Sequence, residues 1–226
     1  METVSIATAS ANNKVVVLVM GATATGKSKL AIDLALHFGG EVINSDKIEV
    51  HDGLDVVTNK VTAGERRGVA HHLIGGVGPD ADYTAADFCR DAARCVESVL
   101  ARGHLPIIAG GSNTYMQAGT IRRLDVTEVL YLKVRGNARD PEAERDAWEA
   151  DVAGPAAMVV GTFLAANIVA NKGTAVSSRS RPKMWMGQAF AQRKGGDGTP
   201  CVAQLETEVV SPGRGLVGFE AAAAVV

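Results

Sequence analysis

Apolar positions in the first part of the chain fall into short continuous runs that alternate with stretches of helical spacing. Residues 15–20 form an unbroken, β-branched run, the pattern of a strand that is buried on both faces. Apolar residues then recur at helical spacing until Gly39 and Gly40, at Leu30, Ala31, Leu34, Ala35 and Phe38. The pattern therefore predicts a strand, a short loop and a helix.

The same alternation continues to about residue 118. A short apolar centre predicts a second strand that ends near Asn44, and residues 105–109 form another buried run. Between them, Thr84 precedes the clearest amphipathic helix as a good N-cap, with Asp87 at the capping-box position. Strands that alternate with helices predict an α/β fold with a doubly wound parallel sheet.

Beyond residue 118 the pattern changes. Residues 119–166 show helical spacing around Trp148 and in 155–164, and we expect no further strand–helix unit there. Residues 167–226 are rich in Ser, Gly and Arg without a sustained period, which predicts a largely disordered tail. We therefore divide the chain into a flexible N-terminus (1–13), an α/β core (14–118), a helical segment (119–166) and a tail (167–226).

The octet GATATGKS at residues 21–28 fits the pattern G-x-x-x-x-G-K-[ST] and lies between the first predicted strand and helix. In that context the pattern indicates a phosphate loop, although a plain glycine turn before a helix is the alternative. Backbone N–H groups would surround an anion at the positive end of the helix. Lys27 would reach phosphate oxygens, and the Ser28 hydroxyl would ligate Mg²⁺. The other loop residues that we assign to this site are Gly21, Thr23, Thr25 and Gly26. The predicted core is thus P-loop NTPase-like.

Asp46 follows the second predicted strand. Ligands of open α/β sheets bind beyond the carboxyl ends of the strands, so Asp46 should face the same edge as the phosphate loop. There it would either help to hold Mg²⁺ through water or act as a general base, while capping of the next turn is the structural alternative. His71 and His72 are adjacent and point to opposite faces of a strand, which favours a structural role or a hydrogen bond to a ligand over one shared metal.

Composition narrows the function classes. The chain is 46% apolar with a formal net charge of −2, which offers no electrostatic case for a nucleic-acid or membrane partner. Its three cysteines form no C-x-x-C pair, as expected in a reducing compartment. Residues 1–13 do not have the pattern of a secretory signal, and we expect a cytoplasmic protein, with a plastid location as the alternative.

Several segments together resemble the adenylate isopentenyltransferases and the related tRNA enzymes, above all the plant branch that makes cytokinins. They cover residues 14–118 almost continuously. They are MGATATGKS (20–28), VINSDK (42–47), GLDVVTNK (53–60), GVAHHL (68–73), YTAADF (83–88) and PIIAGGSN (106–113) with Tyr115. The NSDK and GGSN segments separate this family from other phosphate-loop proteins.

The resemblance implies a prenyl-transfer enzyme. Its donor would be dimethylallyl diphosphate, held by the phosphate loop with Lys27, Ser28 and Mg²⁺, and its acceptor would be the adenine N6 of AMP, ADP or ATP. Asp46 would accept the proton that the N6 amine loses. The resemblance also implies that substrates are positioned by Ser45, Ser112 and Asn113.

The chain departs from the family after residue 118. Residues 121–166 resemble the C-terminal end of family members, so an intervening strand and helical lid look deleted. Loss of the lid would admit water and weaken catalysis. One alternative is therefore an inactive remnant that binds a nucleotide or a diphosphate. Two further alternatives are a small-molecule kinase with ATP on the loop and an enzyme with tRNA as its acceptor, which the net charge disfavours. We expect a monomer.

Overall fold

The structure is a computed structural model. It describes residues 14–23, 25–53, 55–56, 58, 60–111, 124–135, 148–171, 193–194, 200–201 and 204–210. Two of the predicted site residues, Ser112 and Asn113, lie outside the described residues, as does the N-terminal segment 1–13.

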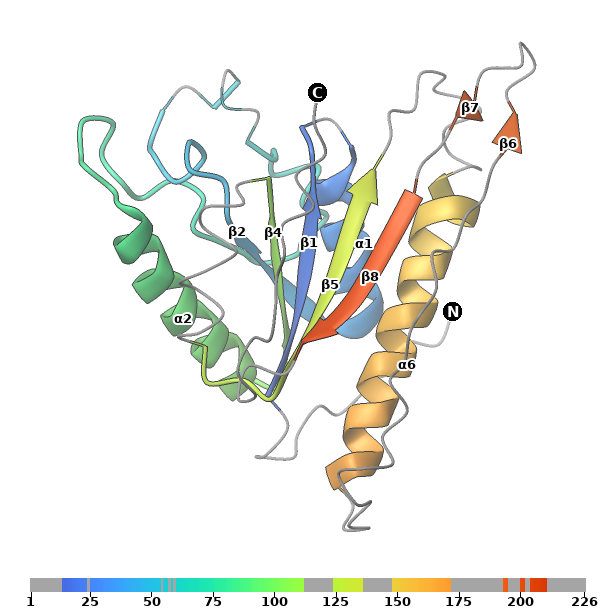
Figure 1. The fold of residues 1–226 in the computed structure, drawn as a ribbon. Helices are drawn as coiled ribbons and strands as arrows, with labels where there is room; N and C mark the ends of the chain where they lie inside the picture. Colours follow the sequence, from blue (N-terminus) through green and yellow to red (C-terminus); the bar gives the residue numbers. More distant parts are fainter. Residues whose placement is uncertain are drawn as a thin grey trace, which may run out of the picture.

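A six-stranded sheet forms the centre of the molecule, in the order β3-β2-β4-β1-β5-β8 (Figure 1). The first five strands in that order run parallel, and β8 pairs antiparallel with β5. The strands are β1 (Val15–Gly21), β2 (Gly40–Asn44), β3 (His71–His72), β4 (Leu105–Gly110), β5 (Glu128–Arg135) and β8 (Gln204–Val210). Two short strands, β6 (Arg193–Lys194) and β7 (Pro200–Cys201), form a separate pair.

Helices cover both faces of this sheet. On one face lie α1 (Lys27–Phe38), the π-helix η2 (Glu149–Ala153) and α6 (Gly154–Asn171), and on the other lies α2 (Ala85–Ala101). Alternate residues of β1 divide between the two cores: Val17 packs with the α1 and α6 side, and Val16 with the α2 side. This arrangement confirms the predicted α/β fold with a doubly wound, mainly parallel sheet.

The local signals for the helices are also found in the structure. Thr84 and Asp87 form the capping box at the start of α2, where each side chain bonds the backbone N–H of the other residue. Gly39 ends α1 in the left-handed conformation, at φ 66°, and its N–H bonds the carbonyl of Ala35.

Strand β5 is absent from the sequence prediction. Residues 128–135 lie within the segment that we expected to be helical, and that expectation is wrong for them. The apolar side chains of β5 are buried on both faces of the sheet. Leu130 and Leu132 pack in the core on the α1 side, and Val129 packs in the core on the α2 side. Such a run is typical of a central parallel strand, and β5 pairs with β1 along the whole length of β1.

Strand β8 corrects the prediction for one part of the tail. Residues 167–226 were expected to be largely disordered, yet residues 204–210 pair with β5 and α6 continues to Asn171. Without β8, β5 would present an unpaired edge of backbone N–H and C=O groups. Leu205 also enters the core, where it is 4% exposed. None of the helices in the described ranges has both the length and the apolar character that a membrane crossing requires.

Candidate functional site

The phosphate loop joins β1 to α1 and leaves the start of the helix open. Gly26 is the N-cap residue, in the left-handed conformation at φ 84°, and no side chain caps the helix. The first N–H groups of α1 therefore remain available to an anion. Within the loop, the Thr25 hydroxyl and the Lys27 ammonium both donate to the Ala22 carbonyl, at 2.8 and 2.6 Å. Thr23 and Ser28 are exposed, and Thr25 is buried.

Close backbone packing explains the glycine that begins this loop. A Cβ atom at Gly21 would lie 2.5 Å from the Val134 carbonyl oxygen and 2.7 Å from the Thr25 hydroxyl oxygen. Any side chain there would push the loop away from β5. Gly111, just after β4, lies beside the same loop, because a Cβ there would meet the carbonyl oxygen of Gly21 at 3.3 Å.

Asp46 lies in a turn that the end of β2 organises. The Asn44 side chain donates to the Leu73 carbonyl at 2.9 Å and accepts from the Asp46 N–H at 3.0 Å. Asp46 Oδ1 accepts from the Ile48 N–H at 2.9 Å. This carboxylate therefore does cap the following turn, as the structural alternative held. Its other oxygen, Oδ2, takes no hydrogen bond from the described part of the chain, which leaves it open to a second role.

Lys27 and Asp46 lie close enough to interact by charge. Burial lowers the pKa of Lys27, whereas the carboxylates of Asp46 and Glu49 raise it. The second strand thus delivers Asp46 to the edge that carries the phosphate loop, where the sequence placed it. Which chemical step each side chain performs stays a prediction.

Glu49 is a site residue that the sequence did not reveal. It lies three residues after Asp46 in the same turn, and burial together with the Asp46 charge raises the pKa of its carboxyl to about 7. Lys27, Lys60 and Arg66 act in the opposite direction. A glutamate in a polar turn carries no periodic signal, so only the folded arrangement brings it to the phosphate-loop lysine.

Ser45 lies just beyond the end of β2. The side chain is completely buried, and among the described residues its hydroxyl has no hydrogen-bond partner. Gly110 lies directly against it, since a Cβ at Gly110 would be 2.0 Å from the Ser45 hydroxyl oxygen. Ser45 thus packs beneath the end of β4, and its predicted contact with substrate stays a prediction.

Lys60 holds the loop that follows the Asp46 turn. Its ammonium donates to the His51 and Gly53 carbonyls, at 2.5 and 3.1 Å, and pairs with the Asp55 carboxylate at 2.6 Å. Only 7% of the Lys60 side chain is exposed. These three contacts keep that lysine within its own loop and make it a structural residue of the site's rim.

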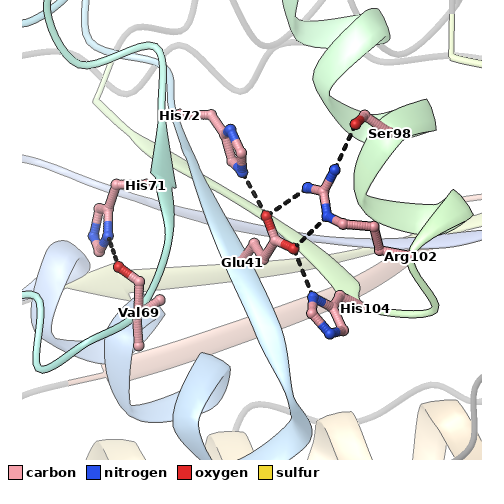
Figure 2. Close-up of polar contacts among 7 residues, drawn as sticks. All are labelled: Glu41, Val69, His71, His72, Ser98, Arg102 and His104. Carbon is pink, nitrogen blue, oxygen red and sulfur yellow. Dashed lines mark hydrogen bonds and ion pairs between the residues drawn. The ribbon is translucent and has the colours of Figure 1, made fainter.

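A second polar cluster lies near the amino end of β2 and serves structure (Figure 2). Glu41, which is 5% exposed, accepts from Arg102 Nε and Nη2 at 3.0 and 2.7 Å, and it contacts His104 and His72, each at 2.6 Å. Hydrogen bonds from Arg102, above all, lower the pKa of Glu41 to about 2. His71 turns away to the Val69 carbonyl at 2.9 Å, so the two histidines have separate structural partners, as expected. Within the described ranges, no group of His, Cys, Asp and Glu side chains is placed to hold a metal by itself.

The chain is similar to proteins that are named as isopentenyl or dimethylallyl transferases. The family model described as IPP transferase matches residues 49–160. The chain is 60% identical to adenylate isopentenyltransferase 3, chloroplastic, of Arabidopsis thaliana, over 46% of this chain and 31% of that protein. It is 50% identical to tRNA dimethylallyltransferase 2 of the same plant, over 46% of this chain and 22% of that protein.

A solved structure is also similar. The full-length tRNA isopentenylpyrophosphate transferase of Bacillus halodurans aligns with a TM-score of 0.48 and 31% identity, over 68% of this chain and 50% of that one. The chain matches only about a third or less of the length of these two curated plant relatives.

Proposed function

The chain belongs to the IPP transferase family, and on that premise we propose that it transfers a dimethylallyl group from dimethylallyl diphosphate to the N6 nitrogen of an adenine nucleotide. The observation that carries the proposal is the shared edge of Lys27 and Asp46, an anion-binding group beside a carboxylate. A phosphate loop alone would serve many reactions, and the carboxylate restricts the choice.

The donor's diphosphate would bind at the start of α1. Its oxygens would accept from the open N–H groups of the first helical turn, and Lys27 would exchange its contact with the Ala22 carbonyl for the phosphate. Positive charge at that point favours departure of the diphosphate, because negative charge builds on the bridging oxygen as the allylic C–O bond breaks.

The residues around the loop suit Mg²⁺, which prefers oxygen ligands, binds few protein groups and keeps several waters. The exposed Ser28 hydroxyl in the first turn of α1 would be such a ligand. When bound, Mg²⁺ would counter the charge of the leaving diphosphate.

Asp46 would take the proton. The adenine N6 lone pair forms the new C–N bond, the electrons of the allylic C–O bond leave with the diphosphate, and the proton lost by N6 passes to the carboxylate. Oδ1 is engaged by the Ile48 N–H, which holds the carboxylate in orientation and would leave Oδ2 to accept the proton. An aspartate fixed in this way needs no reorganisation before it accepts a proton.

A free nucleotide is the acceptor that we favour, and tRNA is the second candidate. Identity to two adenylate isopentenyltransferases is 60% and 62%, against 50% to the tRNA enzyme. The net charge of −2 also gives a tRNA backbone little to bind. The relatives' names include chloroplastic and mitochondrial forms, and the cytoplasm or a plastid stays our prediction for the compartment.

The test is product analysis by mass. The purified chain is incubated with dimethylallyl diphosphate, Mg²⁺ and, in separate reactions, AMP, ADP, ATP or unmodified tRNA. N6-dimethylallyl nucleotide supports the proposal, and prenylated tRNA alone would transfer it to the second candidate. Saturable diphosphate binding without any prenylated product would identify a binding remnant, and γ-phosphate transfer from ATP would identify a kinase.

A further inference from the structure

The indole ring of Trp148 lies against the second glycine of the phosphate loop. A Cβ atom at Gly26 would lie 2.5 Å from both Cη2 and Cζ3 of that ring. Gly26 is in the left-handed conformation, at φ 84°. Trp148 lies in the segment 119–166, far along the chain from the loop. Neither the loop pattern nor the proposed chemistry accounts for this contact.

Polar contacts orient the ring on the outer surface of α1. The indole N–H donates to Asp33 Oδ2 at 3.4 Å, and the Lys29 ammonium lies 4.3 Å from the ring centroid, within the range of a cation–π contact. Asp33 is itself held by Arg67, whose Nη1 donates to Oδ1 at 2.7 Å. The ring thus bridges the loop and the first turns of α1.

The segment that carries Trp148 is fixed to the core. The tryptophan immediately precedes η2, and Val152 in η2 and Ala156 and Val160 in α6 are fully buried. They share a hydrophobic cluster with Leu30 and Leu34 of α1. Because this packing anchors the backbone next to Trp148, the ring presses on Gly26 from a rigid support.

We propose that Trp148 is a positioning residue for the phosphate loop. Its ring holds Gly26 in the conformation that directs the first N–H groups of α1 at a diphosphate. The inference rests on the diphosphate site of the proposed function and deepens it. Gly26 has wide conformational freedom, and the helix lacks a side-chain cap, so the loop's anion-binding geometry needs support from outside. The ring supplies that support by filling the space beside the glycine α-carbon.

Fluorescence and calorimetry test this with inorganic pyrophosphate and Mg²⁺ as the probe. The chain has two tryptophans, so W185F leaves Trp148 as the single indole emitter. In that background the emission should change saturably with pyrophosphate, because a bound anion alters the field around a ring already beside Lys29. By calorimetry, W148A should bind pyrophosphate about tenfold more weakly or worse, whereas W148F, which keeps an aromatic ring against Gly26, should stay within about threefold.

The controls separate positioning from general stability. M158A removes an exposed side chain from α6 and should leave pyrophosphate affinity unchanged. A folded W148A that binds pyrophosphate as the native chain does, while K27A does not bind, would overturn the inference and leave the diphosphate site intact. If W148A does not fold, unchanged Trp148 emission on saturation of the W185F variant overturns it instead. Absence of any pyrophosphate binding by the native chain would overturn both the site and the inference.

Discussion

Lys27 and Asp46 share one edge of the sheet, where burial lowers the pKa of the lysine and the Asp46 carboxylate raises it. The lysine follows β1 and the aspartate follows β2, two strands that both pair with β4. Their proximity is therefore a property of the sheet's topology, because parallel strands end at the same edge. An anion and the proton acceptor for its reaction can meet there.

Replacement of Lys27 by alanine should abolish binding of dimethylallyl diphosphate. The substitution removes a half-buried positive charge from the loop, and the remaining N–H donors carry only partial charges. Isothermal calorimetry measures the loss. Lys14→Ala is the matched control, because Lys14 pairs with Asp125 on the surface near the amino end of β1. Equal affinity of K27A and the native chain would show that the donor binds elsewhere.

Glu49→Gln should change how stability depends on pH. The folded-state pKa of Glu49, about 7, lies above the ordinary value of 4.5, so its contribution is most favourable below pH 4.5 and is lost as the pH rises through 7. At pH 8 the variant should be more stable than the native chain by on the order of 1 kcal/mol, allowing for solvent screening.

Chemical denaturation of both proteins at pH 5 and pH 8 measures this difference. Glu97→Gln, at an exposed position of α2, makes the same charge change as a control. A stability difference that is equal at the two pH values would contradict the assigned environment of Glu49.

Glu41→Gln should destabilise the fold without affecting the loop. Glu41 has a folded-state pKa of about 2, below 4.5, so its stabilisation is complete above pH 4.5 and is lost as the pH falls towards 2. The substitution should lower the unfolding free energy at pH 7 by about 2 kcal/mol. The unfolding free energies of the native chain and the variant, measured as a function of pH, should converge near pH 2. A difference that stays constant down to that pH would contradict the assigned contacts of Glu41 with Arg102 and the two histidines.

Leu205→Ala should destabilise the fold, although Leu205 lies in the segment that was predicted to be a disordered tail. Leu205 is nearly completely buried in the α1-side core, so the truncation leaves a cavity worth about 2–3 kcal/mol. Val209→Ala on the same strand removes a side chain that is 41% exposed and should cost much less. Thermal unfolding of both variants decides the matter. Similar melting temperatures for L205A and the native chain would mean that β8 does not pack as the structure has it.

Local patterns carried much of the sequence prediction. The strand, the glycine-bounded loop and the helix around Lys27 lie next to one another in the chain, and so do Thr84 and Asp87 of the α2 capping box. Each of these features forms from contacts between near neighbours in the chain, so the local residue types are enough to predict it. The edge shared by Lys27 and Asp46 followed from one topological rule about parallel strands.

Most of the missed features depend on contacts between distant segments. Strand β5 is the exception, because its apolar run is itself typical of a central parallel strand and was overlooked when residues 119–166 were interpreted as helical. Strand β8, by contrast, has a place only because β5 offers an edge. The ring of Trp148 reaches Gly26 through the packing of η2 and α6 on α1. Pairing of this kind depends on the whole fold, and periodicity within a window cannot reveal it.

Product formation by an Asp46→Asn variant tests the central claim most directly. Asparagine keeps a carbonyl oxygen for the Ile48 N–H, so the turn should survive, but it cannot accept the N6 proton. We predict that the native chain converts dimethylallyl diphosphate and an adenine nucleotide into N6-prenylated product, and that the variant binds pyrophosphate normally yet forms product at least about a hundredfold more slowly. Equal rates for the folded variant and the native chain would contradict the account.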